Sequence, residues 1–484
     1  MEAMADRGVS RSKMKQDMNR LFMMNHHHEQ TLWIYWSLIM LGFWLIMTPL
    51  TFNYDIGVVS PSGGREVWLD LPTRIACMKN SDMISGFLLT LLGFRSLKAN
   101  HPVSLWISCF IGVWLSFAPI LFWAPTAISY YNDTFIGMIV MALTVLIPGM
   151  PNMINYMEMG TSHPPGWSYN PSSWSQRWIL IVLGFLGWMV SRYLAAFQLG
   201  YIDTVWDPFF GNSTAQVLNS SMSHALPISD AGLGSLAYTL EFLMGFMGSP
   251  ARWRSMPWMV TLFGILVIPL GLVHIFLVIS QPVTVGFWCT FCLLAALIML
   301  PMIPLEVDEV IAMAQFIKRK VKSGEGFWKI FWKGGGEEER KVDVKNREDM
   351  PDLYSFPDGP GRIVKSSFWG MNFPVSLILS SLLGLLIVFL PWWIETTKTH
   401  DNILRVSGLL IITTAVIAMG ETLRPFRLLN VLFALVAGAS GFVLSASAAI
   451  NLISASLGIL VALTSLPKGK IQHTFAGWDK FLKW

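Results

Sequence analysis

Stretches of about 20 residues without Asp, Glu, Lys or Arg recur along this chain of 484 residues. A segment of that length and composition is long enough to cross the hydrocarbon core of a bilayer as a helix. The composition agrees, because 53% of the residues are hydrophobic and only 13% are charged. We therefore predict an all-α integral membrane protein.

The apolar stretches number about twelve and fall into three groups of four. They cover 31–50, 82–95, 102–123 and 134–150, then 178–200, 232–248, 257–279 and 284–304, and finally 370–394, 402–420, 427–444 and 449–466. The predicted domains are a tail (1–30), the first group (31–150), a linker (151–177), the central group (178–305), a charged connector (306–369), the third group (370–466) and a second tail (467–484).

Lysines and arginines predict the orientation, since cytoplasmic loops carry an excess of them. With the amino terminus inside, 28 of the 34 basic residues fall on the cytoplasmic side and five on the outer side. We predict a multi-pass protein of the bacterial inner membrane with both termini in the cytoplasm. The net charge of +4 does not indicate nucleic acid, because the basic residues lie at the ends of apolar stretches.

Aromatic residues alternate with lysines at 327–333, within the connector. This composition predicts a helix lying on the anionic inner leaflet, in contact with membrane lipid. An ordinary solvated loop with a few aromatic anchors is the alternative.

The first and third groups are similar enough to be copies of one unit. Ser85-Gly86 corresponds to Ser407-Gly408, and Gly137 corresponds to Gly458. Small residues at such positions allow helix backbones to approach closely in lipid. These groups carry little reactive chemistry, and we predict that they serve as a scaffold.

The first group resembles a known family at particular motifs. Ser81-Asp82, Phe117-Ala-Pro and the sequence Phe-Trp-Ala-Pro at 122–125 are similar to those of the SPW-repeat family of bacterial membrane proteins. The resemblance implies an architecture rather than a reaction.

Cys289 and Cys292 form the only close pair among four cysteines, and they lie near the start of a predicted span. Residues at i and i+3 share a helix face and lie close enough for a disulfide. The helix dipole also stabilises a thiolate near a helix amino terminus, which favours thiol exchange. The alternative is that the two cysteines are only small buried side chains that pack in the helix. Zinc would require two further ligands, so we predict no metal site.

The central group is similar to the vitamin K epoxide reductase family over residues 175–310. It has four spans, a long loop between the first and second, and the motif Trp288-Cys289-Thr-Phe-Cys292. The resemblance implies a four-helix bundle around a quinone such as ubiquinone or menaquinone, with two electrons exchanged between the quinone and the catalytic pair Cys289 and Cys292. Cys292 would lie nearer the quinone, and the pair near the outer face. The quinone pocket would include Ser220, Tyr238 and Trp288.

One feature of the family is missing, because the loop at 201–232 has no cysteine, and Thr214 stands where a relay cysteine is expected. Three interpretations remain. A thiol donor or a periplasmic thioredoxin-like partner reaches Cys289 directly, or Cys77, in the outer loop of the first group, substitutes for the relay. In the third, thiol exchange is lost, and the protein is a non-catalytic membrane scaffold or carrier. We expect an enzyme.

Four further residues lie in or near spans, and each has two interpretations. Arg192 contacts a quinone oxygen or extends to the interface, and His274 binds a carbonyl or packs with a hydrogen bond. Glu241 and Glu421 relay protons or pair with a nearby arginine.

Overall fold

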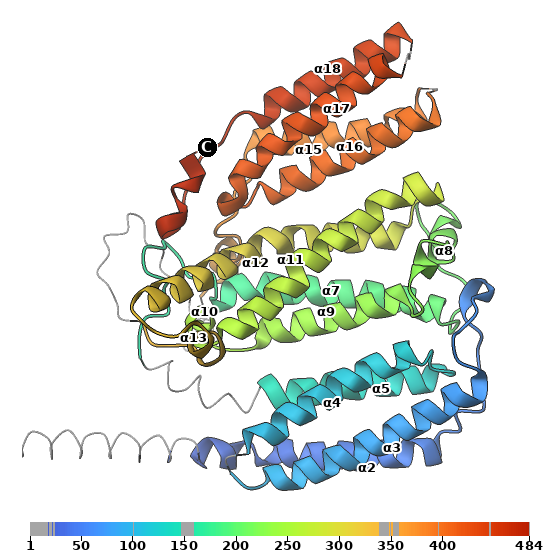
Figure 1. Ribbon diagram of the computed structural model, residues 1–484, viewed down its shortest axis with the longest axis vertical. Coiled ribbons are helices and arrows are strands. Elements are labelled where there is room, and N and C mark those ends of the chain that lie inside the picture. Colours follow the sequence, from blue (N-terminus) through green and yellow to red (C-terminus); the bar gives the residue numbers. More distant parts are fainter. Residues whose placement is uncertain are drawn as a thin grey trace, which may run out of the picture. The chain divides into compact units, whose positions relative to one another are not determined.

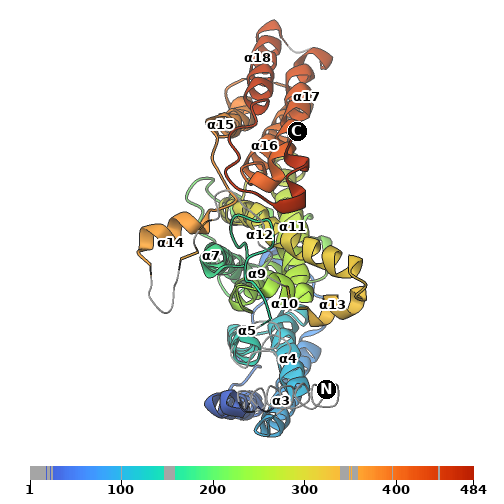
Figure 2. The same cartoon turned by 90° about the vertical axis from the view of Figure 1, so that its left-hand side faces the viewer.

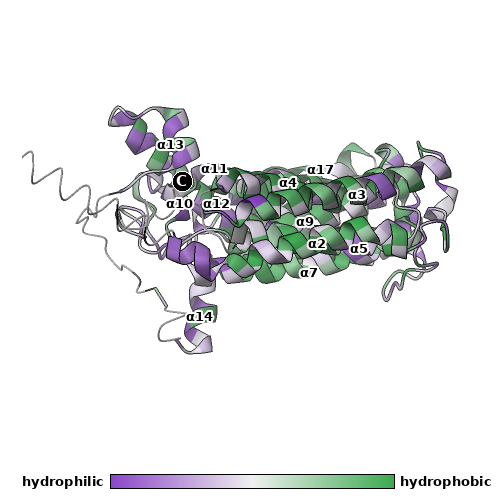
Figure 3. Cartoon of the chain, turned by 90° about the horizontal axis from the view of Figure 1, so that it is seen from below, coloured by the Kyte–Doolittle hydropathy of each residue, from purple (hydrophilic) through white to green (hydrophobic). Residues whose placement is uncertain are grey.

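Every regular element described by the computed structural model is a helix, which confirms the all-α prediction. The structure describes residues 18, 22, 25–99, 101–146, 159–337, 348, 350, 351, 358–394, 396–444 and 447–483. Most of the predicted tail 1–30, and parts of the predicted linker and connector, lie outside the described residues. Hydrophobic residues occupy the middle of the long helices and hydrophilic residues their ends (Figure 3), as expected for helices that cross a membrane.

Nine helical segments in the described ranges are long and apolar enough to be membrane spans. They are α2 (Leu32–Thr51), α4 (Pro102–Leu121), α7 (Trp174–Gln198), α11 with η4 (Pro257–Val285), α12 (Thr290–Lys322), α15 with η5 (Val375–Trp392), α16 (Lys398–Ile417), η6 with α17 (Glu421–Val443) and α18 (Ala448–Ser465). The chain is therefore a multi-pass membrane protein.

The other three predicted spans fall on helices that are short or carry charges. They correspond to α3 (Leu71–Ser96), which contains four charged residues, α5 (Ala127–Met141) and α9 (Asp230–Phe246). The helices α5 and α9 have 15 and 17 residues, which is at or below the usual length of a span. The total of twelve therefore remains a prediction.

The chain divides into two compact units, Met1–Ile154 and Asn155–Trp484. In the first unit α2 packs against α3, and α4 against α5, each pair meeting at glycines. A Cβ added to Gly42 would lie 2.7 Å from the carbonyl oxygen of Gly86, and one added to Gly112 would lie 2.8 Å from that of Gly137. Only a residue without a side chain lets these backbones approach so closely.

The third group repeats this arrangement within the second unit. A Cβ added to Gly408 of α16 would lie 2.7 Å from the carbonyl oxygen of Gly384 of α15. Gly458 of α18 packs on Gly438 of α17 in a similar way. The sequence pairs Gly86 with Gly408 and Gly137 with Gly458 between the two groups. The two members of each pair thus make corresponding close approaches.

The residues that resemble SPW repeats contact their neighbours through hydrogen bonds. Ser81 accepts a hydrogen bond from the indole of Trp114 at 2.9 Å, and the carbonyl of Trp123 accepts one from Arg74 at 2.8 Å. The prediction that Cys77 lies in a loop is wrong, because α3 begins at Leu71, well before the apolar run. Proline at the second helical position suits a helix start, since the first turn does not need its N–H.

The central bundle of the second unit consists of α7, α9, α11 and α12 (Figure 1). The loop between α7 and α9 contains α8 (Ser213–Leu218) and η3 (Ser223–Ala225), and it covers the end of the bundle where α12 begins. We call this the thiol end. The short helices α10 (Arg252–Ser255) and α13 (Phe327–Lys333) lie at the opposite end.

The helix α12 continues without a break past the predicted boundary at residue 305, to Lys322. Glu306, Asp308 and Glu309 are therefore buried within the bundle rather than part of a solvated connector. Glu309 forms an ion pair with Arg252 at 2.6 Å. A buried carboxylate is tolerated when such a partner compensates its charge and forms its hydrogen bonds. Arg252, the partner of Glu309, lies far from it in the sequence.

The segment predicted to lie on the membrane surface is helical and forms α13. Ile330 is buried, whereas Trp328 and Trp332 are 67% and 58% exposed. Both α13 and α14 (Pro360–Ser367) project from the bundle (Figure 2). Exposed rings beside lysines are typical of a helix at headgroup level.

We predict that Gly408→Ala lowers the midpoint of thermal unfolding of the purified protein by several degrees, because the added methyl group collides with the α15 backbone. Gly361→Ala in α14 is the matched control, since a Cβ added there would have no other atom within 4 Å. This control should match or slightly exceed the reference midpoint, because alanine favours helix. Equal midpoints for the two variants would contradict the close approach.

Candidate active site

Cys289 and Cys292 are joined by a disulfide with a Cα–Cα separation of 5.2 Å. Cys289 is the N-cap of α12, and its sulfur accepts a hydrogen bond from the backbone N–H of Cys292 at 3.1 Å. Cys289 is fully buried, and Cys292 is partly exposed. After reduction, the N–H groups of the first turn and the helix dipole would stabilise a thiolate here.

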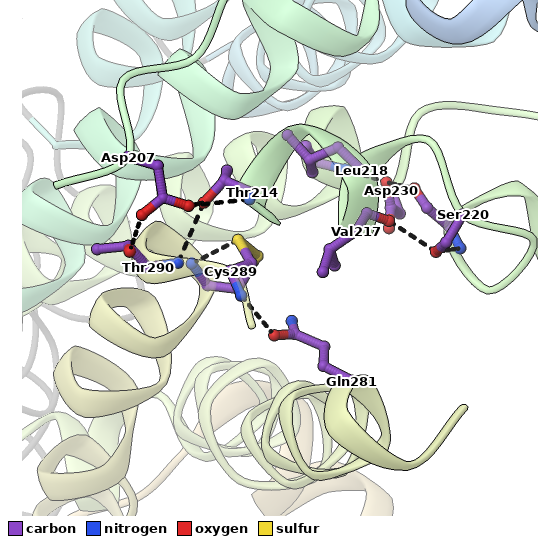
Figure 4. The surroundings of a disulfide bond; sticks show 12 residues. Asp207, Thr214, Val217, Leu218, Ser220, Asp230, Gln281, Cys289 and Thr290 are labelled. Atoms are coloured by element: carbon purple, nitrogen blue, oxygen red, sulfur yellow. Dashed lines mark hydrogen bonds between the residues drawn. A yellow bond between two sulfur atoms is a disulfide. The ribbon is translucent and has the colours of Figure 1, made fainter. Parts of the chain in front are cut away.

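Asp207 and Thr214 attach the loop to the first turn of α12 (Figure 4). The carboxylate of Asp207 accepts hydrogen bonds from the hydroxyls of Thr214 at 2.7 Å and Thr290 at 2.5 Å. The hydroxyl of Thr214 in turn accepts one from the N–H of Thr290 at 3.1 Å. Thr214, the residue at the expected relay position, therefore connects the loop to the residue next to Cys289.

Partial burial opposes ionisation of Asp207, but hydrogen bonds from Thr214 and Thr290 prevail and lower its pKa from 3.8 to about 2. A carboxyl whose pKa is lowered by folding stabilises the fold at any pH above its unfolded pKa. That contribution is lost as the pH falls from about 4 through about 2. The loop attachment is thus complete at neutral pH.

Gln281 holds the other side of the thiol pair. Its side-chain oxygen accepts a hydrogen bond from the backbone N–H of Cys289 at 3.1 Å, and the residue is buried in η4 (Gln281–Val285) (Figure 4). Cys289 is therefore held from the end of α11 through Gln281 and covered by the loop through Thr290.

Cys292 faces a cavity of about 480 Å³ in the central bundle. Four helices and the loop contribute to its wall, and most of the lining side chains are aliphatic. The lining residues with polar side chains or sulfur are few, and they are Ser191, Met222, Ser223, Asp230, Tyr238, Glu241, His274, Gln281, Cys292 and Met299. Large apolar walls with a few polar groups are typical of small-molecule sites.

A hydrogen-bond network lies at the thiol end of the cavity. The amide nitrogen of Gln198 donates to Ser223 at 2.7 Å and to Asp230 at 2.5 Å. Its amide oxygen accepts a hydrogen bond from Ser229, the N-cap of α9, at 2.6 Å. These contacts fix the beginning of α9 against the end of α7.

The structure brings only some of the predicted pocket residues together. Tyr238 lines the cavity, with its hydroxyl donating to the carbonyl of Ala295 at 3.1 Å. Ser220 is not in the lining, and its hydroxyl donates to the carbonyl of Val217 at 2.6 Å. Trp288 is also outside the lining and stacks on Phe210.

Sequence reasoning missed Ser223, Asp230 and Gln281. A polar residue such as Gln281 at the end of an apolar run was a usable signal, because polar groups in a span require partners. The Ser229-Asp230 pair also had the form of a helix start. No local signal distinguishes Ser223 from Ser220, since both lie in one irregular loop.

The structure shows the surroundings of the four residues that had two interpretations. His274 lines the cavity near the ring of Tyr238, whereas Arg192 lies over the ring of Trp188 outside the lining. Glu421 contacts His473 at 3.3 Å. Glu241 makes no ion pair among the described residues, and both its carboxyl oxygens are buried without a hydrogen-bond partner there.

No cluster of three or more His, Cys, Asp and Glu side chains is placed to hold a metal ion in the described part of the chain.

Residues 178–307 match the model of the vitamin K epoxide reductase family. Neither the curated proteins nor the solved structures include a match to the chain. The central bundle is therefore a vitamin K epoxide reductase domain within a longer membrane protein. Its family indicates a membrane thiol–disulfide oxidoreductase.

We predict that Thr214→Val increases the rate at which a maleimide labels Cys289 by about tenfold or more. The substitution removes the hydrogen bond from the Thr214 hydroxyl to the Asp207 carboxylate, worth about 1.5–3 kcal/mol, and the one that the hydroxyl accepts from Thr290, so the loop opens more often. Labelling is measured in full-length protein whose other three cysteines are replaced by serine.

Thr284→Val is the matched control, because Thr284 is an exposed threonine at the same end of the bundle. It should label at the reference rate. Unchanged labelling of the Thr214→Val protein would show that the attachment does not limit access to Cys289.

Proposed function

We propose that the protein exchanges two electrons between the Cys289/Cys292 pair and a quinone such as ubiquinone or menaquinone. The observation that carries this proposal is the position of Cys292, which joins the disulfide to an apolar cavity of about 480 Å³. Cavities of about 300–1,000 Å³ with mainly apolar walls suit small organic ligands. The family match supports a redox role for the pair.

The cavity fits a quinone in its chemistry as well as in its size. Aliphatic side chains from α9 and α11 suit a ring and the start of an isoprenoid chain, and polar groups occur at separated positions. Tyr238 is the predicted pocket residue that lies on this wall. Ser220 and Trp288 would act indirectly, by shaping the loop and the approach to α12. When bound, a quinone would accept two electrons and two protons as the dithiol becomes a disulfide.

The two cysteines have different surroundings, which support different roles. Cys292 lies on the cavity wall, and we assign it the reaction with the ligand. Cys289 is fully buried beneath the loop, and we assign it the exchange with an external thiol. Thiol exchange requires direct access to a sulfur atom. The loop must therefore move away from Cys289 before a thiol donor or a periplasmic thioredoxin-like protein can react.

We place the protein in the bacterial inner membrane, with both termini in the cytoplasm and the thiol end at the outer face. The distribution of lysine and arginine supports this orientation. The exposed aromatic residues and lysines of α13, at the end of the bundle opposite Cys289, are consistent with anionic lipid at the inner leaflet.

A non-catalytic scaffold or carrier is the second candidate. It is favoured by Thr214, which replaces a relay cysteine with a buried, hydrogen-bonded threonine. The two candidates differ in whether the thiol pair changes its redox state with a quinone.

We predict that an added quinone analogue oxidises the reduced Cys289/Cys292 pair in membranes, and that the matching quinol reduces the disulfide in part. Thiol trapping followed by mass spectrometry measures the state of each cysteine. A Cys77→Ser/Cys109→Ser protein should behave like the reference, because neither residue takes part in the disulfide or lines the cavity. If the pair stays reduced after the quinone is added, the non-catalytic scaffold or carrier is the remaining interpretation.

A further inference from the structure

Glu241 differs from most buried charged residues of the second unit. Its side chain lines the cavity and is about 1% exposed, and neither carboxyl oxygen has a hydrogen-bond partner among the described residues. In contrast, Arg252 and Glu309 satisfy each other through two bonds of 2.6 Å. A buried carboxyl without a partner is costly and is far more stable when protonated. Its position on a cavity wall indicates a functional role.

The helix geometry directs Glu241 toward the ligand space. It follows Tyr238 by three residues, so the two side chains share one face of α9. Side chains in a helix lean toward its amino terminus, which for α9 is the thiol end. The lining on α12 runs from Cys292 through Ala295 to Met299, about 10 Å along the helix axis. The carboxyl of Glu241 therefore belongs to the deeper part of the same cavity.

The groups around Glu241 leave it available for proton exchange. On its own helix, the hydroxyl of Tyr238 already donates to the carbonyl of Ala295. From α11, the titratable group on the wall is His274, and α7 contributes Ser191 and Leu194, which do not titrate. From α12, Glu306 lies within electrostatic range of Glu241.

Glu306 provides a second carboxyl beyond the cavity. It is fully buried, and neither of its carboxyl oxygens has a hydrogen-bond partner in the described part of the chain. It also interacts electrostatically with Arg252 and Glu309. The acidic groups thus continue from the cavity toward the end of the bundle opposite the thiol pair.

We propose that Glu241 is a proton-transfer residue that donates a proton to, and accepts one from, the quinone oxygen facing the deep end of the cavity. This inference rests on the proposed function. It adds a proton-transfer residue to the thiol pair.

The reaction balances without another oxidant. The two thiols lose two electrons and two protons and form the S–S bond. The conversion of quinone to quinol takes up two electrons and two protons. The protonated Glu241 supplies one of these protons, and its carboxylate regains a proton from solvent after the reaction. One thiol proton reaches the other quinone oxygen, and the second thiol proton is released to solvent. General acid–base transfer of this kind contributes about 10²–10⁴-fold to a rate.

The test compares Glu241→Gln with the reference in full-length protein, because glutamine keeps the size of the side chain but cannot exchange a proton. Disulfide formation is followed by thiol trapping in a single turnover with a short-chain ubiquinone over a range of pH. Glu241→Gln should be slower by about tenfold or more and should bind the same quinone with an affinity within about threefold. The matched control is Glu325→Gln, which changes a partly exposed carboxylate in the turn between α12 and α13.

A second measurement does not depend on turnover. In protein with Cys289→Ser and Cys292→Ser, the infrared band of a protonated carboxyl should shift when the ubiquinone binds, and Glu241→Gln should remove that shift. A Glu241→Gln protein that reacts at the reference rate, together with an unshifted band, would overturn the inference. If the reference thiols do not react with the quinone, the proposed function fails, and the infrared shift alone decides whether Glu241 contacts the ligand.

Discussion

Two adjacent carboxylates near the middle of α12 hold together the elements that meet at the end of the bundle opposite the thiol pair. Glu309 accepts two hydrogen bonds from Arg252 and one from Ser172, at 2.5–2.6 Å. Asp308 accepts hydrogen bonds from the hydroxyls of Tyr169 and Thr422, each at 2.6 Å. Buried charges stabilise a fold only when such partners compensate the lost hydration. Because α12 also begins with the cysteine pair, this arrangement positions the helix that carries the disulfide.

These contacts also make the third group part of the second unit. Thr422 belongs to η6, between α16 and α17, so its bond to Asp308 attaches that group to the central bundle. Nearby, Glu421 accepts hydrogen bonds from the backbone N–H groups of Gln472 and His473, each at 3.0 Å. The carboxy-terminal segment is thereby bound to the same end of the bundle. A flanking group attached at this point can brace the central bundle without contacting the cavity.

The cavity combines two kinds of environment. At the thiol end, Gln198 and Asp230 belong to a hydrogen-bonded network that is already satisfied. Deeper in the bundle the wall is mainly aliphatic, and Tyr238, His274 and Glu241 are among its few polar residues. A satisfied network positions backbone and costs little to keep, whereas an unsatisfied carboxyl is retained at a cost in stability. This contrast separates the residues that shape the site from the residue that we infer to exchange protons.

The sequence by itself determined the features that depend on local periodicity. Charge-free runs predicted the long helices, and the spacing of Cys289 and Cys292 predicted that they can form a disulfide, since i and i+3 share a helix face. Only the tertiary structure decided which distant residues meet. It selected Tyr238 rather than Ser220 for the cavity wall, and it buried Glu306 where a solvated connector was expected. The reason is physical, because helix geometry fixes neighbours within one or two turns, while packing between helices fixes the partners of a buried polar group.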